Sequence, residues 1–364
     1  MVSCSSGIPL LECEVDDTEN MFAAAAERIF TDMADLQTAA DAPYGAWRGA
    51  LWQTLLENGL TLAMVPEELG GVGMAADQAF ELLQVAGRWA VPTTLADTMI
   101  ANWALALTGC DPNGEGQIAI VDPLRSTIQI DDGGLINGWA VGVADASTAT
   151  LIIAIAEHEG SPQLILIDPE TCKIESGKSL SFENADRVTV TGAAPLRVEP
   201  LGDAVNILEM AAVGRAHQIA GALEAMLDMS VDYAKQRVAF GRPISKFQAI
   251  QHHLALLGEE TAAAVSAACS AADALAMDTK GPELLLEVAS AKIRCGEAAE
   301  RGCAIAHQVF GAIGYTAEHP LHRLTLGALA WRDDFGNESH WALKLGDQIM
   351  QQPADALWPL LSSR

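Results

Sequence analysis

The sequence has few cysteines and few aromatic residues, and each shortage excludes a class of protein. Its seven cysteines form no CxxC pair and show no metal-ligand spacing with the eight histidines, so we expect neither a disulfide framework nor a metal site. Aromatic residues make up 5% of the chain, whereas apolar residues make up 50%. This balance favours packed helices over an all-β sandwich.

Basic residues are also scarce. The chain has 21 lysines and arginines against 48 aspartates and glutamates, which gives a net charge of −27. That field repels phosphate backbones and anionic lipids, so we expect binding neither to nucleic acid nor to a membrane surface. No apolar run reaches the length of a membrane span, and the first twenty residues lack the pattern of a secretory signal. We therefore expect a soluble, cytoplasmic protein.

The order of the sequence patterns predicts a mainly α protein with a small β domain. Apolar residues recur at helical spacing between residues 22 and 107. A loop rich in glycine and proline, at residues 65–73, interrupts this pattern. Short β-prone runs separated by turn residues occupy 117–190, which predicts a small, barrel-like antiparallel domain. Long helical patterns follow, and a shorter, less regular helical tail ends the chain.

The long helical patterns cover residues 204–237, 247–277 and 283–309, and the tail covers 321–350. Long helices joined by short turns predict a four-helix bundle. The expected domains are an N-terminal helical domain, a middle β domain and a C-terminal bundle, at residues 1–115, 116–200 and 201–364.

Residues 233–244 carry the strongest chemical signal in the sequence. A helical pattern delivers Arg237 and then breaks at Gly241 and Pro243. A guanidinium beside a helix N-terminus holds a pyrophosphate well, because its planar fork and the free backbone N–H groups all donate hydrogen bonds. The alternative interpretation is that Arg237 faces solvent and binds no ligand. The helical hairpin around this break does not by itself distinguish the two interpretations.

Two segments resemble the signatures of the acyl-CoA dehydrogenase family. Residues 233–248 read Tyr-x3-Arg-x2-Phe-Gly-x-Pro-Ile-x2-Phe-Gln, which is similar to the first signature. Residues 308–323 read Gln-Val-Phe-Gly-Ala-Ile-Gly-Tyr-Thr-Ala-Glu-His-Pro-Leu-His-Arg, which resembles the second. Residues 52–73 look like the family's N-terminal region, so the resemblance spans nearly the whole chain. It implies that family's fold, and FAD as the cofactor.

In that family the two signatures bind FAD at a junction between subunits. The resemblance implies that Arg237 contacts the pyrophosphate. It also implies that the cofactor is lined by Phe240, Phe247 and Gln248. Contacts to the adenosine side, across the subunit interface, would come from Gln308, Val309, Phe310, Gly311 and Ala312. A glycine at such a position permits close approach of the backbone to the cofactor.

Members of the family oxidise an acyl-CoA thioester. A buried glutamate removes the α-proton, and the flavin accepts the β-hydride. By position, Phe335 replaces that glutamate in one arrangement known in the family, and Ala211 replaces it in the other. Asp334 is the nearest carboxylate, so it is the one candidate catalytic residue. Its alternative interpretation is a solvated loop acid or a partner for Arg332.

The β domain also departs from the family pattern. It lacks the Thr-Glu-Pro-x-Ala-Gly-Ser-Asp-like loop that holds the flavin ring, and Trp139 comes earlier than the stacking tryptophan. One half of a shared FAD site is present and the other half is eroded. The chain resembles the partner subunits of bacterial α2β2 members that act on bulky thioesters, including those of steroid side chains. This implies an intact homologue as partner, with an electron-transfer flavoprotein as the next acceptor.

Two other hypotheses fit the same residues. In the first, the chain is an ordinary homo-oligomeric acyl-CoA dehydrogenase that uses Asp334 or another acid as its base. In the second, it is a scaffold or a CoA-binding relic without a redox role. Bound flavin in the chain expressed alone separates the first hypothesis from a partner subunit. Co-expression with an intact homologue tests the second.

Overall fold

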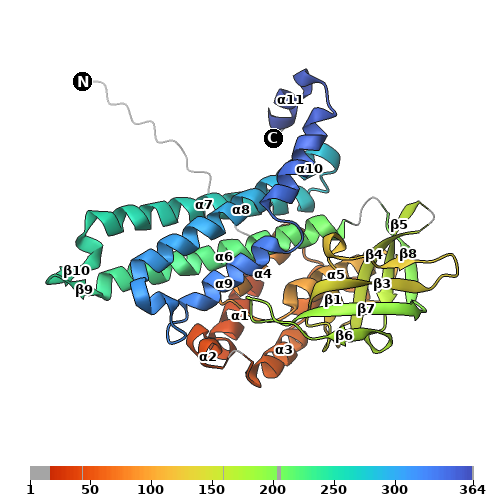
Figure 1. The fold of residues 1–364 in the computed structure, drawn as a ribbon, viewed down its shortest axis with the longest axis horizontal. Coiled ribbons are helices and arrows are strands. Elements are labelled where there is room, and N and C mark those ends of the chain that lie inside the picture. Colours follow the sequence, from red (N-terminus) through yellow and green to blue (C-terminus); the bar gives the residue numbers. More distant parts are fainter. Residues whose placement is uncertain (1–16, 43, 159, 203–205, 363–364) are drawn as a thin grey trace.

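The computed structural model describes residues 17–42, 44–158, 160–202 and 206–362 and is mainly helical with a small β domain (Figure 1). Helices occupy both ends of the described chain, and the longer strands lie between them. This order confirms the predicted fold class. The domain boundaries themselves stay a prediction.

The last two N-terminal helices pack directly on the first helix of the bundle. The N-terminal helices are α1 (Asp17–Met33), α2 (Leu36–Asp41), α3 (Trp47–Glu57), α4 (Ala76–Arg88) and α5 (Leu95–Leu107). At the crossing of α4 with α6 (Ile207–Gln236), a Cβ on Gly87 would clash with the backbone of Gln218, and one on Gly221 with that of Gln84. These two glycines therefore set the short distance between the helices.

The β domain consists of two four-stranded sheets rather than a closed barrel. One sheet has the order β1 (Ile118–Ile120), β4 (Leu151–His158), β5 (Ser161–Ile167), β8 (Arg197–Pro200). The other has the order β2 (Gln129–Ile130), β3 (Ile136–Ala144), β7 (Ala185–Ala193), β6 (Lys173–Glu175). Side chains from both sheets form a hydrophobic cluster of their own.

The prediction of a purely antiparallel β domain was wrong at one pair of strands. β1 runs parallel to β4, with Ile118 opposite Leu151. The chain leaves the first sheet after β1, forms β2 and β3 in the second sheet, and then returns. Such a crossover between neighbouring strands produces parallel pairing, whereas a tight hairpin produces antiparallel pairing.

The C-terminal bundle consists of α6, α7 (Gln248–Ala276), α8 (Gly281–Phe310) and α9 (Leu321–Asp333), as predicted. The expected helix start at Ala204 lies outside the described residues. α6 and α8 end at the same end of the bundle (Figure 1). The short hairpin of β9 (Val238–Ala239) and β10 (Arg242–Pro243) projects beyond that end.

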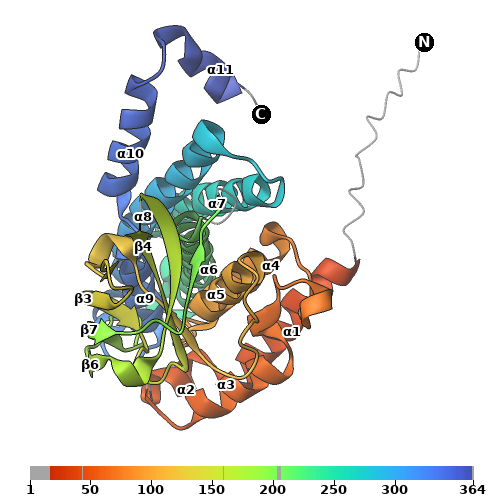
Figure 2. The ribbon, with the colours of Figure 1, turned by 90° about the vertical axis from the view of Figure 1, so that its right-hand side faces the viewer.

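The less regular helical tail predicted for residues 321–350 is interrupted once in the structure. α9 stops at Asp333, and α10 (Glu338–Met350) and α11 (Leu357–Ser362) follow. In the break between α9 and α10, Phe335 and Gly336 have φ angles of 54° and 91°. α10 and α11 project away from the other domains in both views (Figure 1, Figure 2). In the described part of the chain, no helix combines the length and apolarity needed to cross a bilayer.

Candidate functional site

The two signature segments meet at one end of the bundle. The hydroxyl of Tyr233, one turn before the end of α6, donates a hydrogen bond to the carbonyl oxygen of Phe310 at 3.4 Å. The two rings also stack, with centroids 4.4 Å apart. The sequence places these residues 77 positions apart. The fold therefore brings the first signature against the second within one chain.

The hairpin at this end exposes a cationic and aromatic surface. Arg237 ends α6, and its side chain is exposed. Phe240, at the hairpin tip, has a φ of 52° and is 96% exposed. The guanidinium of Arg242 lies over the ring of Phe247 at 4.3 Å from its centroid. Gln248 opens α7 and is exposed, so an anion near Arg237 would also lie near a helix N-terminus.

The second signature divides into exposed and buried residues. Gln308, Gly311 and Ala312 are exposed, whereas Val309 and Phe310 are buried. Gly311 ends α8 with a φ of 65°, and no atom lies within 4 Å of the position where a Cβ would stand. A ligand can therefore approach the backbone at Gly311. The buried ring of Phe310 lies beneath that surface and packs against the rings of Tyr233 and His319.

Sequence reasoning gave no role to Arg242 or to Tyr233, although both lie within the first signature. A basic residue directly after Gly241 was the available signal for Arg242. The observed residues fit the pyrophosphate and adenosine portion of a dinucleotide, because exposed guanidinium groups and open backbone occur together.

Asp334 lies in a partly buried ion cluster away from the hairpin. Its carboxylate oxygens lie 3.3 Å from Arg215 Nε and 3.3 Å from Arg125 Nη1. Arg215 also pairs with Asp97 at 2.8 Å. Burial raises the pKa of Asp97 to about 6, although the charge of Arg215 opposes that shift. The predicted alternative partner, Arg332, pairs instead with Glu338 and Glu300.

The loop that carries Asp334 is fixed from several sides. The ammonium group of Lys292, on α8, donates to the carbonyl oxygens of Trp331, Arg332 and Asp334 at 3.1, 3.1 and 2.8 Å. Asp122, from the β domain, accepts a hydrogen bond from the backbone N–H of Phe335 at 3.2 Å. Lys292 is 1% exposed, and burial lowers its pKa to about 8. It therefore acts as a buried cap for the C-terminus of α9.

Both positions expected to hold a catalytic base lie beside this cluster. Ala211 is one turn before Arg215 on α6, and the guanidinium of Arg215 lies 5.5 Å from the ring centroid of Phe335. The cavity between Arg215, Asp334 and Phe335 has a volume of about 10 Å³. A site of that size holds about one water molecule and cannot hold an acyl thioester.

Strand β3 carries Trp139 and also contributes to the cavity at the cluster. Trp139 lies on β3 and is 38% exposed, with the guanidinium of Arg187 over its ring at 4.8 Å. Gly142 and Ala144, at the end of the same strand, line the 10 Å³ cavity. The β domain therefore closes one side of this cavity.

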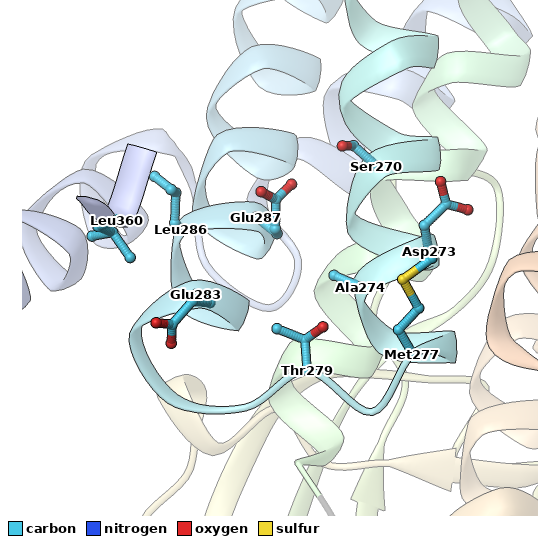
Figure 3. A pocket seen from close by; sticks show the side chains of 9 residues that line it. All are labelled: Ser270, Asp273, Ala274, Met277, Thr279, Glu283, Leu286, Glu287 and Leu360. Atoms are coloured by element: carbon cyan, nitrogen blue, oxygen red, sulfur yellow. The ribbon is translucent and has the colours of Figure 1, made fainter. Parts of the chain in front are cut away.

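A separate pocket of about 430 Å³ lies between the turn that joins α7 to α8 and α11 (Figure 3). Figure 3 places the carboxylates of Asp273, Glu283 and Glu287 around it, with Leu360 at its α11 side. This charge disfavours phosphate-bearing ligands. Within the described ranges, no group of histidine, cysteine and acidic residues is arranged to hold a metal ion.

Comparison with known proteins gives matches at the level of both sequence and fold. Residues 202–338 match the family model described as the C-terminal domain of acyl-CoA dehydrogenase. The acyl-CoA dehydrogenase IpdE2 of Mycobacterium tuberculosis is 29% identical over 277 residues, which cover 75% of this chain and 78% of that protein.

Two solved structures share the fold. The ChsE4-ChsE5 complex from Mycobacterium tuberculosis has a chain with a TM-score of 0.85 and 20% identity, covering 93% of this chain and 99% of that one. A variant of the Tcur3481-Tcur3483 steroid ACAD has a TM-score of 0.83 and 24% identity, covering 92% of this chain and 98% of that one. These similarities establish a common architecture from the N-terminal helices to the bundle.

Proposed function

Because the chain belongs to the acyl-CoA dehydrogenase family, we propose that it is the partner subunit of a hetero-oligomeric acyl-CoA dehydrogenase. In this proposal it completes the FAD site of an intact homologue and contributes no catalytic base. One observation carries the proposal: the cavity between Phe335 and the ion cluster has a volume of only about 10 Å³.

The hairpin end of the bundle supports the cofactor role. The chain has a net charge of −27, yet two arginines, Arg237 and Arg242, are exposed together at the hairpin. Exposed cations in so acidic a protein are suited to an anionic ligand, and FAD supplies a pyrophosphate. Arg237 would hold that group, while Gln308 and the open backbone at Gly311 would contact the adenosine side. FAD would supply the hydride acceptor, at a ring held by the partner.

The ion cluster supports the absence of a base. A general base must reach the substrate proton and must be free to accept it. Both carboxylate oxygens of Asp334 face guanidinium groups at 3.3 Å. A carboxylate held in that way has no room for a thioester beside it.

The substrate and the further partners follow from the same proposal. The substrate is an acyl-CoA with a bulky acyl group, and one structure that shares the fold is a steroid ACAD. The intact homologue binds the substrate and holds the base. An electron-transfer flavoprotein receives the electrons from the flavin.

The test is co-expression with an intact homologue, followed by measurement of flavin per chain. We expect about one FAD per two chains in the complex and none in this chain alone. Arg237→Gln should weaken FAD binding by about 10-fold to 100-fold, since a hydrogen bond to a charged group contributes about 1.5–3 kcal/mol. Arg301→Gln is the matched control, because Arg301 lies on the side of α8 and pairs with Glu260 at 3.1 Å.

The opposite outcome is also defined. If this chain alone binds one FAD per protomer and oxidises an acyl-CoA, it is a self-sufficient dehydrogenase. If no intact homologue restores flavin binding or activity, the scaffold hypothesis replaces the partner subunit.

A further inference from the structure

A cavity of about 850 Å³ lies where α5 ends, α6 begins and α7 turns into α8. α6 has 30 residues, so its two ends are about 45 Å apart. The cavity is therefore at the opposite end of the bundle from Arg237. Thr279 lies between this cavity and the acidic pocket of Figure 3, because it lines both.

The wall of the cavity is largely apolar and adaptable. It includes Met64, Met74 and Met210, together with Trp103 and Leu284. Methionine side chains are flexible and polarizable, so they adjust to ligands of different shape. A volume of this order is typical of pockets that enclose a small organic molecule.

One buried carboxylate faces this apolar wall. Glu209 is 7% exposed, and burial raises its pKa. Lys344, from α10, lies 3.6 Å from its Oε1, beyond the usual hydrogen-bond distance. The amide side chain of Asn206 accepts from the backbone N–H of Glu209 at 3.2 Å, which fixes the first turn of α6. The carboxylate is thus held at a defined position beside an apolar space.

The charges around the cavity select the polar end of a ligand. Lys280 lines the cavity, and its ammonium group lies 2.6 Å from a carboxylate oxygen of Asp278. Glu209 and Asp278 are each paired with a lysine, Lys344 and Lys280, so the charges at the wall balance. The acceptor on this wall is the carboxylate of Glu209, whose ion pair with Lys344 is long at 3.6 Å. A group that donates a hydrogen bond is favoured.

We propose that this cavity binds an apolar molecule whose polar end, a hydroxyl or an amine, donates a hydrogen bond to Glu209. This site is separate from the FAD site and does not depend on the partner subunit. It adds a small-molecule binding function to a chain whose own interior has no space for a thioester beside Phe335.

The experiment measures displacement of the neutral fluorophore Nile red from the purified full-length chain. Two neutral competitors of matched length are used, 1-decanol and 2-decanone, so that the acidity of the protein does not attract either one. The alcohol donates a hydrogen bond and the ketone does not. We expect 1-decanol to displace Nile red at about tenfold lower concentration, which corresponds to about 1.4 kcal/mol.

Two variants assign the effect to this cavity. Glu209→Met should abolish the preference for the alcohol and leave the affinity for 2-decanone unchanged. Ala76→Trp should fill the cavity and abolish displaceable Nile red binding. Ala276→Trp, at an exposed position of the same wall, serves if the first filling variant does not fold. Equal affinities for the two competitors, or binding that survives both tryptophan variants, would overturn the proposal.

Discussion

The hydroxyl of Tyr233 donates to the carbonyl oxygen of Phe310 at 3.4 Å, and the two rings stack with centroids 4.4 Å apart. This contact joins the end of α6, which carries Arg237, to the end of α8, which carries Gln308. Tyr233→Ala should remove both parts of the contact, lower the free energy of unfolding by about 2 kcal/mol and reduce FAD retention in the complex.

Tyr233→Phe keeps the ring and is the matched control for that variant. It should cost about 1 kcal/mol or less, because a single hydrogen bond is lost. Urea unfolding and flavin absorbance of the complex check the two effects. Equal flavin retention in the alanine variant and the wild type would show that the contact does not organise the cofactor surface.

Asp334→Asn distinguishes a structural carboxylate from a catalytic one. We expect a loss of about 2 kcal/mol in stability, since two ion pairs with Arg125 and Arg215 are weakened. The kcat of the complex should stay within about twofold of the wild type. If Asp334 is instead the base, kcat should fall by about 100-fold or more. Thermal unfolding and steady-state kinetics on the same preparation separate these outcomes.

Lys292→Met removes the ammonium group that donates hydrogen bonds to the carbonyl oxygens at the C-terminal end of α9. Three carbonyl oxygens lose a hydrogen bond, those of Trp331, Arg332 and Asp334. Relief from burying the ammonium group offsets part of this cost, so we expect a net loss of about 2–4 kcal/mol in urea unfolding. Lys246→Met, at an exposed position, should change stability by about 0.5 kcal/mol or less. A similarly small change for Lys292→Met would contradict the capping role.

We expect the free energy of unfolding to fall as the pH rises, because the carboxyl group of Glu183 is buried. Burial raises its pKa from 4.5 to about 8, with Asp145, Asp97 and Asp334 adding to the shift and Arg215 opposing it. The folded state therefore binds more protons than the unfolded state between about pH 4.5 and 8. In that window the free energy of unfolding falls with pH, by up to about 1.4 kcal/mol per unit for one proton.

Glu183→Gln keeps the size of the side chain and removes the titration. The hydroxyl of Ser181 donates to Glu183 Oε2 at 3.1 Å, and the amide oxygen of glutamine accepts equally well. We expect a shallower pH dependence of urea unfolding between pH 5 and 8. Parallel curves for the variant and the wild type would assign the pH dependence to other groups, such as Asp97.

The helices and the surface at the end of the bundle were predictable because their signals are local. Apolar residues at helical spacing predicted helices between residues 22 and 107, among them α5, and the break at Gly241 and Pro243 predicted the hairpin. The ion cluster was not predictable in the same way. Its residues come from all three regions of the chain, and periodicity gives no information on such distances.

A weaker signal for the cluster was nevertheless present. Arg215 lies within an apolar stretch of α6, and Lys292 lies among small residues of α8. A lone cation on an apolar helix face requires a buried partner. The partner itself could not be named, because Asp97, Asp334 and the carbonyl groups at the end of α9 become neighbours only in the tertiary fold.

The salt-bridged interior has a consequence for how the molecule melts. Arg215 holds a carboxylate from the N-terminal helices and another from the end of α9, and Arg125 links that same loop to the strands. If one of these regions unfolds alone, a buried charge in the regions that stay folded loses its counterion. Heating should therefore produce one calorimetric peak instead of a succession of independent regional transitions.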